Sequence, residues 1–250
     1  MSAERLQLER IQGNPASLPE QELGKLAILY ASVFAGEPWN EYTVCSKDNT
    51  FFGLDTEPGG DCPQTDCQGT LSFAYPADET ATYITGELLR SDAALWLLRD
   101  SEDQDRMVGF SWGFSYPDTV AFAEGKYKTP AMRVAIDGLL RRRGIGANGL
   151  WYLSESGILD DTQYRGQGWS RIFHERRLEV ARSFRLDAVQ RTASQGNMYR
   201  TSRRTMTQVM GPAMRVEDGT RRLQPTGNVV NGLMDSENPA RVLFARSREP

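Results

Sequence analysis

The stretch that decides the fold is residues 149–184, which read GLWYLSESGILDDTQYRGQGWSRIFHERRLEVARSF. An apolar run from Leu150 to Leu153, continued by Ile158 and Leu159, predicts a buried strand. A polar turn containing glycine follows at 160–168. Apolar residues then recur at helical spacing, at Trp169, Ile172, Phe173, Val180 and Phe184. The order of strand, glycine turn and helix is typical of an α/β domain.

The turn reads Tyr164-Arg165-Gly166-Gln167-Gly168-Trp169-Ser170. Glycines let the backbone turn tightly and approach a ligand, and the amides at a helix N-terminus stabilise an anion. The sequence therefore predicts that the amides of residues 165–170 cradle a diphosphate. The turn lacks the Gly-Lys-Ser/Thr end of the nucleoside triphosphatase loop and the third glycine of a dinucleotide fingerprint. A plain strand-to-helix turn is therefore the alternative interpretation.

Outside this stretch, helical and strand-like patterns alternate without an internal repeat. Helices are predicted at 19–34, 79–89, 130–143 and 197–207, and strands at 94–98, 107–112, 186–192 and 241–245, the first two of these strands forming a hairpin. Thr129 is expected to cap the third helix, with Pro130 at its first position. We expect one domain over residues 1–250, with insertions at about 45–70, which contains the cysteines, and at about 116–148, which is helical.

Composition and charge restrict the class of protein. The chain has 250 residues, 39% of them hydrophobic and 25% charged, which is typical of a folded globular protein. No window is apolar enough to span a membrane, the first twelve residues are not a secretory signal, and three cysteines are too few for a disulfide framework. We therefore expect a cytoplasmic protein without a membrane partner.

The charges are distributed unevenly along the chain. Residues 1–110 carry 7 basic and 19 acidic side chains, whereas residues 111–250 carry 22 and 14. An acidic half suits a cationic ligand and a basic half suits an anionic one, although halves of a sequence need not be halves of a structure. The acidic insertion argues against a nucleic-acid partner, because phosphate neutralisation needs a basic face.

These residues resemble the GCN5-related N-acetyltransferase (GNAT) superfamily. Its acyl-coenzyme A signature is Arg or Gln, two residues, Gly, one residue, then Gly or Ala, and this chain has Arg165 to Ser170 in that place, with Ser170 at the last position. The resemblance covers roughly residues 20–45 and 94–248, and the stretch 150–207 carries it. It implies a mixed, splayed central β-sheet flanked by helices, an α/β fold of the α+β type, open between the strand bearing Glu155 and the strand at 186–192.

The resemblance also implies where acetyl-coenzyme A would bind. Its pantetheine would lie along Ile158 and Leu159, and its diphosphate on the amides of the turn. The residues implied in cofactor binding are Ile158, Leu159, Arg165, Gly166, Gln167, Gly168, Trp169, Ser170 and Asn197. A cofactor held in this way presents its thioester at a fixed place, which removes much of the entropic cost of meeting an amine.

Amide formation requires an uncharged amine, so a base is useful. Glu155 matches the position from which members of the family often deprotonate the amine through a water, and the alternatives are a surface glutamate or an ion pair. The tyrosine that protonates the departing thiolate in many members would fall near Arg204. Tyr199 stands a turn or more earlier, so its role as the acid and an ordinary packing role both remain open.

The cysteines at 45, 62 and 67 lie in an insertion with little apolar periodicity. A loop without a core needs another source of order, and a zinc ion would supply it. The expected ligands are Cys45, Cys62, Cys67 and Asp48, which stands where a fourth cysteine would be. Unpaired reduced thiols and a redox pair between Cys62 and Cys67 are the alternatives.

The sequence thus predicts an N-acetyltransferase in which an amine of a small molecule or of a protein attacks acetyl-coenzyme A directly in a ternary complex. The alternative is a silent acyl-coenzyme A sensor, or an interaction protein with a zinc-ribbon-like insertion. His174 is the only histidine, and we expect it on the surface, which leaves no histidine-based triad. Trp39, Trp112 and Trp151 are expected in the core rather than in an acceptor pocket.

Overall fold

A computed structural model describes residues 5–11, 14–37, 39–90, 92–193, 229–234 and 241–246, and only the backbone from residue 192 onward. The chain divides into two compact units. We call Met1–Leu89, Leu95–Ser111 and Ser156–Trp169 the N-terminal unit, and Arg90–Ala94, Trp112–Glu155 and Ser170–Pro250 the C-terminal unit. The prediction of one domain stays a prediction.

The N-terminal unit contains four strands of the main sheet. They are β1 (Leu6–Arg10), β5 (Ala94–Asp100), the first half of β6 (Arg106–Tyr116) and β8 (Ser156–Ile158), in that order across the sheet. The predicted hairpin is confirmed, since β5 and β6 are neighbours joined by a short turn. Strand β1 escaped prediction because its sequence, LQLER, is mostly polar, and pairing with β5 is what orders it.

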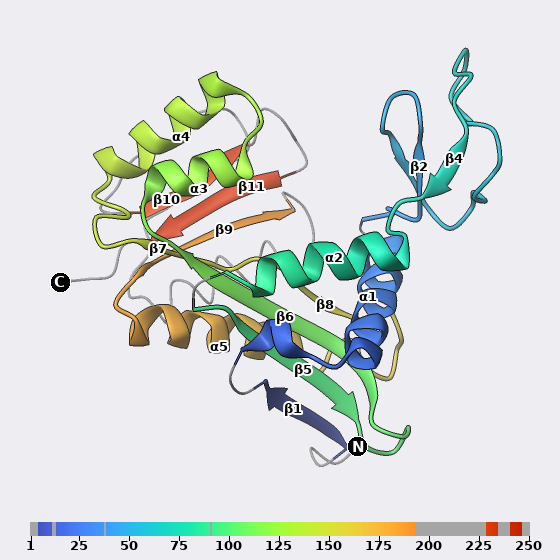
Figure 1. Cartoon of the computed structure of the whole chain (residues 1–250), viewed down its shortest axis with the longest axis horizontal. Helices are drawn as coiled ribbons and strands as arrows, with labels where there is room; N and C mark the ends of the chain where they lie inside the picture. The colour runs from blue at the N-terminus through green and yellow to red at the C-terminus, as the bar shows by residue number, and fades with distance from the viewer. Residues whose placement is uncertain are drawn as a thin grey trace. The chain divides into compact units, whose positions relative to one another are not determined.

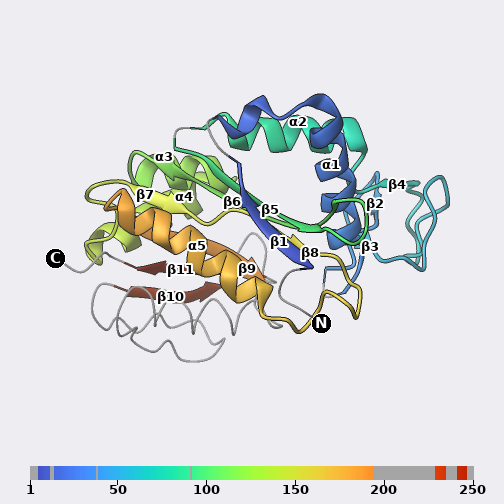
Figure 2. The same cartoon turned by 90° about the horizontal axis from the view of Figure 1, so that it is seen from below.

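Two helices of this unit, α1 (Glu20–Ala35) and α2 (Ala77–Leu88), lie side by side over one face of these strands (Figure 1, Figure 2). The short 3-10 turn η1 (Pro15–Ser17) precedes them. The ring of Tyr30 on α1 stacks on Phe110 of β6, with centroids 5.6 Å apart. A Cβ at Gly157 of β8 would lie 2.4 Å from Cγ1 of Val33, so only glycine lets α1 approach so closely.

A second, three-stranded sheet belongs to the same unit. Its order is β3 (Phe51–Phe52), β2 (Thr43–Cys45) and β4 (Leu71–Phe73), with both neighbours antiparallel to β2. Its core consists of Cys45, Cys62 and Leu71, against which Phe52 and Cys67 pack. The sequence predicted a loop or a small inserted subdomain over residues 45–70. It did not predict the strands, because strands of two or three residues leave no measurable alternation.

The C-terminal unit carries the mixed part of the main sheet. The second half of β6 pairs antiparallel with β7 (Leu150–Tyr152), which pairs in parallel with β9 (Asp187–Ala193), followed by β11 (Arg241–Arg246) and β10 (Val229–Met234). The expected α/β class with a mixed sheet is therefore confirmed. The strand predicted over 150–159 is two short strands. Both pair with β6, but their registers differ by one residue, with Tyr152 opposite Phe114 and Ile158 opposite Gly109, and only β7 also pairs with β9.

Side chains of β7 show how the helices of this unit are arranged. The ring of Tyr152 lies 5.7 Å from Phe122 on α3 (Thr119–Lys126), whereas the neighbouring Trp151 lies 6.0 Å from Phe184, just after α5 (Trp169–Ser183). Successive side chains of a strand face opposite sides. Helix α3, with α4 (Pro130–Arg142) beside it, therefore covers one face, and α5 covers the other (Figure 1, Figure 2). Thr129 caps α4 through the amide of Met132, as predicted.

Trp112 and Trp151 are fully buried, which confirms their expected place in the core. Every helix among the described residues is too short or too polar to cross a membrane.

A buried carboxylate joins distant segments of the N-terminal unit. Asp100, at the end of β5, is fully buried and accepts hydrogen bonds from Nε of Arg5 at 2.9 Å and from the hydroxyl of Tyr164 at 2.9 Å. The Arg5 hydrogen bond, with help from Tyr164, lowers the pKa of Asp100 to about 2. The network therefore fixes Tyr164, the residue just before the glycine turn.

We expect Asp100→Asn to lower the free energy of unfolding at pH 7 by roughly 2 kcal/mol, because a charged acceptor with several donors is lost. The exposed Asp103 forms an ion pair with Arg106 three residues away, so Asp103→Asn should change the free energy of unfolding by less than about 0.5 kcal/mol. Because the folded pKa is depressed, the contribution of Asp100 is present above its ordinary pKa of 3.8 and is lost as the pH falls toward 2. Urea denaturation between pH 7 and pH 2 measures the difference between the variants and its dependence on pH. Equal midpoints of unfolding for Asp100→Asn and Asp103→Asn at pH 7 would contradict the prediction.

Candidate functional site

Strand β8 leaves one edge of its backbone without a neighbouring strand in the described structure. Its register with β6 places Gly157 opposite Phe110, and the amide of Leu159 donates to the carbonyl of Val108 at 2.9 Å. Since hydrogen-bonded and non-hydrogen-bonded pairs alternate in an antiparallel ladder, the amide and carbonyl of Ile158 face away from β6. The two residues predicted to hold pantetheine therefore differ in whether their backbone groups are available. Ile158 offers its backbone, whereas the amide and carbonyl of Leu159 are used by the protein's own chain.

The glycine turn follows β8 in the same unit. Gly166 has φ +76° and Gly168 has φ +84°, conformations that favour glycine, and a Cβ at either position would meet no atom within 4 Å. In the part of the chain that the structure describes, the amides of residues 166–168 have no acceptor, whereas the amide of Arg165 donates to the carbonyl of Asp161 at 2.9 Å. Trp169 and Ser170 begin α5, where amides lack helical partners. The amides of residues 166–168 are therefore open in the described structure, and that of Arg165 is not.

Side chains around the turn hold it in place. Nε of Arg165 lies 2.5 Å from Oδ1 of Asp160, and its Nη2 donates to the carbonyl of Glu37 at 3.2 Å. Arg5 donates through Nη2 to Oε1 of Gln163 at 2.9 Å, in addition to its contacts with Asp100. The base of the turn is therefore fixed by ion pairs and hydrogen bonds, while its tip is open.

Glu155 lies in the break between β7 and β8 rather than within a strand, and its side chain is neither fully buried nor exposed. Its carbonyl accepts a hydrogen bond from the amide of Trp112 at 2.9 Å and from Nη1 of Arg177 at 3.4 Å. Arg177 on α5 is fully buried. Burial lowers its pKa to about 10, although the negative charge of Glu155 acts in the opposite direction.

Sequence reasoning missed Arg177. Its spacing could have revealed it, because Arg177 stands four residues after Phe173 and therefore on the same buried face of α5. A buried cation at such a position needs a partner. Asn197 and Tyr199 lie outside the described residues, so their predicted roles stay predictions.

The expectation for His174 is wrong: its side chain is fully buried. The buried face of α5 includes Phe173, His174, Arg177, Leu178 and Ala181, a wider stripe than the predicted one. Burial, with the nearby charge of Arg177, keeps the pKa of His174 well below its ordinary value. The ring is therefore neutral, and in the described structure neither of its nitrogens has a hydrogen-bond partner.

A cleft of about 790 Å³ in the N-terminal unit was not foreseen. Exposed apolar side chains contribute to its wall, at Ile28 of α1, at Leu54 and at Phe73 of β4. The carboxylates of Glu41, Asp160 and Asp161 stand at the same cleft, together with one cation, Arg106. Asp160 is paired with Arg165, and Glu41 accepts the hydroxyl of Tyr75. The combination of apolar wall and acidic groups suits a cation with an apolar body.

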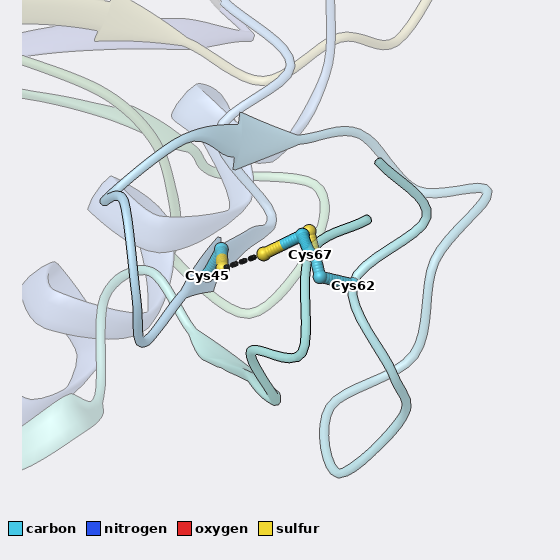
Figure 3. A group of neighbouring side chains, drawn as sticks. All are labelled: Cys45, Cys62 and Cys67. Atoms are coloured by element: carbon cyan, nitrogen blue, oxygen red, sulfur yellow. Dashed lines mark hydrogen bonds between the residues drawn. The ribbon is translucent and has the colours of Figure 1, made fainter. Parts of the chain in front are cut away.

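The three cysteines come together, as Figure 3 shows. Their sulfur atoms all lie within 4.8 Å of one another, and none forms a disulfide. Burial raises the pKa of the Cys62 thiol to about 11, while the amide of Gly69 lowers that of Cys67. Asp48 is outside this group of three. Its Oδ1 accepts the amide of Thr50 at 2.9 Å, and its side chain interacts with the thiol of Cys45.

No protein-family model matches the chain, and no curated protein matches its sequence. Solved structures of N-acetyltransferases are similar to it. The polyamine N-acetyltransferase of Drosophila melanogaster is 12% identical with a TM-score of 0.48, and the similarity covers 96% of this chain and 100% of that one. A mosquito arylalkylamine N-acetyltransferase-like protein, 5b, is 10% identical with a TM-score of 0.47, over 96% and 99% of the two chains.

The aminoglycoside N-acetyltransferase AAC(6')-Iy, solved in complex with CoA, is 9% identical with a TM-score of 0.42, over 85% and 91%. TM-scores below 0.5 at such identities say nothing about substrate or catalytic residues. The function proposed below therefore rests on the described geometry.

His174 gives a clean pH prediction because it is the only histidine in the chain. Its folded pKa is depressed, so below its ordinary value of 6.5 the unfolded state binds the proton more tightly and stability falls as the pH drops from 7 to 5. The slope approaches about 1.4 kcal/mol per pH unit. In His174→Leu this slope should largely disappear. Urea denaturation at several pH values measures it, and an unchanged slope in the variant would show that His174 is not the group responsible.

Proposed function

We propose that this protein transfers an acyl group, in the first place acetyl, from acyl-coenzyme A to an amine. The observation that carries the proposal is the pairing of two features in the N-terminal unit. The backbone edge at Ile158 is open, and the open amides of residues 166–168 follow it shortly before α5. An extended ligand with amide groups can add to a strand edge, and a diphosphate suits the amides before a helix.

The residues present fit coenzyme A in both respects. Its pantetheine has amide groups that match the amide and carbonyl of Ile158, as a further strand would. Its diphosphate matches the turn, where positive φ at Gly166 and Gly168 leaves open space above the backbone. The thioester of the bound cosubstrate supplies an activated acyl group, and the protein's part is to position it and to handle a proton.

Glu155 is the proposed base. A deprotonated carboxylate accepts a proton from the ammonium of the acceptor, directly or through a water, and leaves the lone pair free to attack. The amine nitrogen then bonds to the carbonyl carbon of the thioester and releases its second proton to the solvent, the carbon–sulfur bond breaks, and the thiolate takes up a proton. The buried cation of Arg177 favours the ionised form of Glu155 electrostatically. Tyr199 remains the proposed source of the proton for the thiolate.

The acceptor that we propose is an amine with an apolar body, from a small molecule or a protein side chain. The cleft offers Ile28, Leu54 and Phe73 to such a body and carboxylates to the ammonium. The excess of acidic residues over the first 110 positions favours a cation in the same way.

We expect Gly168→Ala to weaken coenzyme A binding at least tenfold, because the added Cβ lies in the open space above the turn and strains its backbone. Gly59→Ala is the matched control. Gly59 has nearly the same φ, +86°, and equally open space, but it lies in the loop before β4. Both variants should lose comparable stability, roughly 1 kcal/mol. Calorimetric titration with acetyl-coenzyme A measures the affinities, and equal losses in both variants would remove the cradle assignment.

Glu155→Gln should lower the rate of thiol release at least 100-fold, since a positioned base contributes about that much or more, while leaving coenzyme A affinity unchanged. Glu179→Gln is the control, because Glu179 is an exposed residue of α5 that pairs with Arg176. Free thiol is measured with a panel of apolar amines. Wild-type rates in Glu155→Gln would exclude Glu155 as the base, and binding without turnover in the wild type would favour a sensor instead.

A further inference from the structure

Three sulfur atoms converge in the small sheet of the N-terminal unit. Cys45 ends β2, and Cys62 and Cys67 lie in the loop before β4 (Figure 3). Sγ of Cys45 lies 3.6 Å from Sγ of Cys67, and all three sulfurs fall within 4.8 Å of one another. A disulfide would require about 2.05 Å. Thiolates about 2.3 Å from a tetrahedral zinc ion are about 3.8 Å apart, which is close to the observed spacing.

The sulfur of Cys45 receives a hydrogen bond from the backbone, since the amide of Lys47 donates to it at 3.4 Å. Hydrogen bonds to a charged form stabilise it, and a thiolate is the form that binds a metal.

Gly69 is a further sign that the cluster requires close approach. A Cβ at this position would lie 2.4 Å from Sγ of Cys45 and 3.4 Å from Sγ of Cys67. Since real Cβ atoms do not come so close to a neighbour, any other residue would displace the sulfur of Cys45. The backbone at Gly69 therefore closes directly over the sulfurs.

The small sheet has little else to hold it together. Its core is the two buried cysteines and Leu71, with Phe52 and Cys67 packed against them, whereas Phe51 and Phe73 are exposed. Strands of two or three residues bury too little apolar surface to be stable alone, and a structural metal commonly supplies the missing free energy in such small elements.

We propose that Cys45, Cys62 and Cys67 bind one zinc ion through their sulfur atoms, with an oxygen donor as the fourth ligand. Binding releases the thiol protons to the solvent. Three sulfur ligands select zinc over the hard cations Mg²⁺ and Ca²⁺, which prefer oxygen. This site is independent of the acyl transfer proposed above, and its test does not depend on that activity.

The fourth ligand has two possible sources, a water and the carboxylate of Asp48. The side chain of Asp48 interacts with the thiol of Cys45, and its Oδ1 accepts the amide of Thr50 at 2.9 Å. A carboxylate beside one of the sulfurs is within reach of a role as the oxygen donor.

The ion would fix the loop before β4, which carries Cys62 and Cys67, to Cys45 at the end of β2, and so support the wall of the cleft. Phe73 lies at the end of β4, two residues after Leu71 of the sulfur core, and lines the cleft. The zinc ion therefore has a structural role, which is to hold the acceptor side of the N-terminal unit in shape.

The test uses the full chain, purified without added metal and analysed for zinc by mass spectrometry. We expect about one zinc per chain, and after removal of the metal with a chelator, titration with Co²⁺ should give the intense thiolate-to-metal absorption of tetrahedral sulfur coordination. A metal-free protein that gives no such absorption when fully reduced would overturn the proposal. So would a native mass that shows two cysteines joined in a disulfide.

Variants locate the ligands. Cys45→Ser, Cys62→Ser and Cys67→Ser should each weaken zinc binding at least 100-fold, measured by competition with a chromophoric chelator. Ser72→Ala, an exposed residue of β4 without a sulfur contact, should bind as the wild type does. Asp48→Asn decides the fourth ligand: a loss of tenfold or more assigns the oxygen to Asp48, and a smaller change assigns it to water. Wild-type affinity in all three cysteine variants would overturn the site, and the Co²⁺ spectrum of the wild type tests it even if a variant fails to fold.

Discussion

The buried carboxylate of Asp100 is the contact on which the geometry of the candidate cofactor site depends. It holds Arg5 from the N-terminal segment and Tyr164 from the segment after β8, and Arg5 in turn reaches Gln163. Because an ionised group without solvent must be paired, these donors have little freedom to move. The residues that follow Tyr164 can therefore adopt the open conformation with positive φ at Gly166 and Gly168, in which amides face outward instead of pairing within the protein.

The sites proposed for cosubstrate, acceptor and zinc all use residues of the N-terminal unit. Ile158 and the glycine turn offer backbone groups, the cleft offers apolar side chains beside carboxylates, and the cysteines offer sulfur. Each site thus uses the ligand chemistry that its target prefers: amides for a diphosphate, carboxylates for an ammonium, thiolates for a soft metal.

Sequence patterns predicted those features that depend on neighbours along the chain. Pro130 after Thr129 marked the start of α4, the apolar stripe from Trp169 marked α5, and two glycines marked the open turn. The features that the sequence did not predict depend on contacts between distant segments. The polar β1 is ordered by pairing with β5, and the break near Glu155 arises where the register with β6 shifts by one residue between β7 and β8. His174 is buried on a face of α5 that is wider than its apolar residues indicate. The spacing of the three cysteines along the sequence suggested a metal site, but only the structure gives the distances between their sulfur atoms.

The most direct test of the account is nuclear magnetic resonance of ¹⁵N-labelled protein titrated with coenzyme A. The amide signals of Gly166, Gln167, Gly168 and Ile158 should shift in a saturable manner, because these groups change from solvent to phosphate or pantetheine as their partner. The amides of Arg165 and Leu159, which already donate to the carbonyls of Asp161 and Val108, should shift far less. Saturable binding that leaves the signals of Gly166, Gln167 and Gly168 in place would contradict the account.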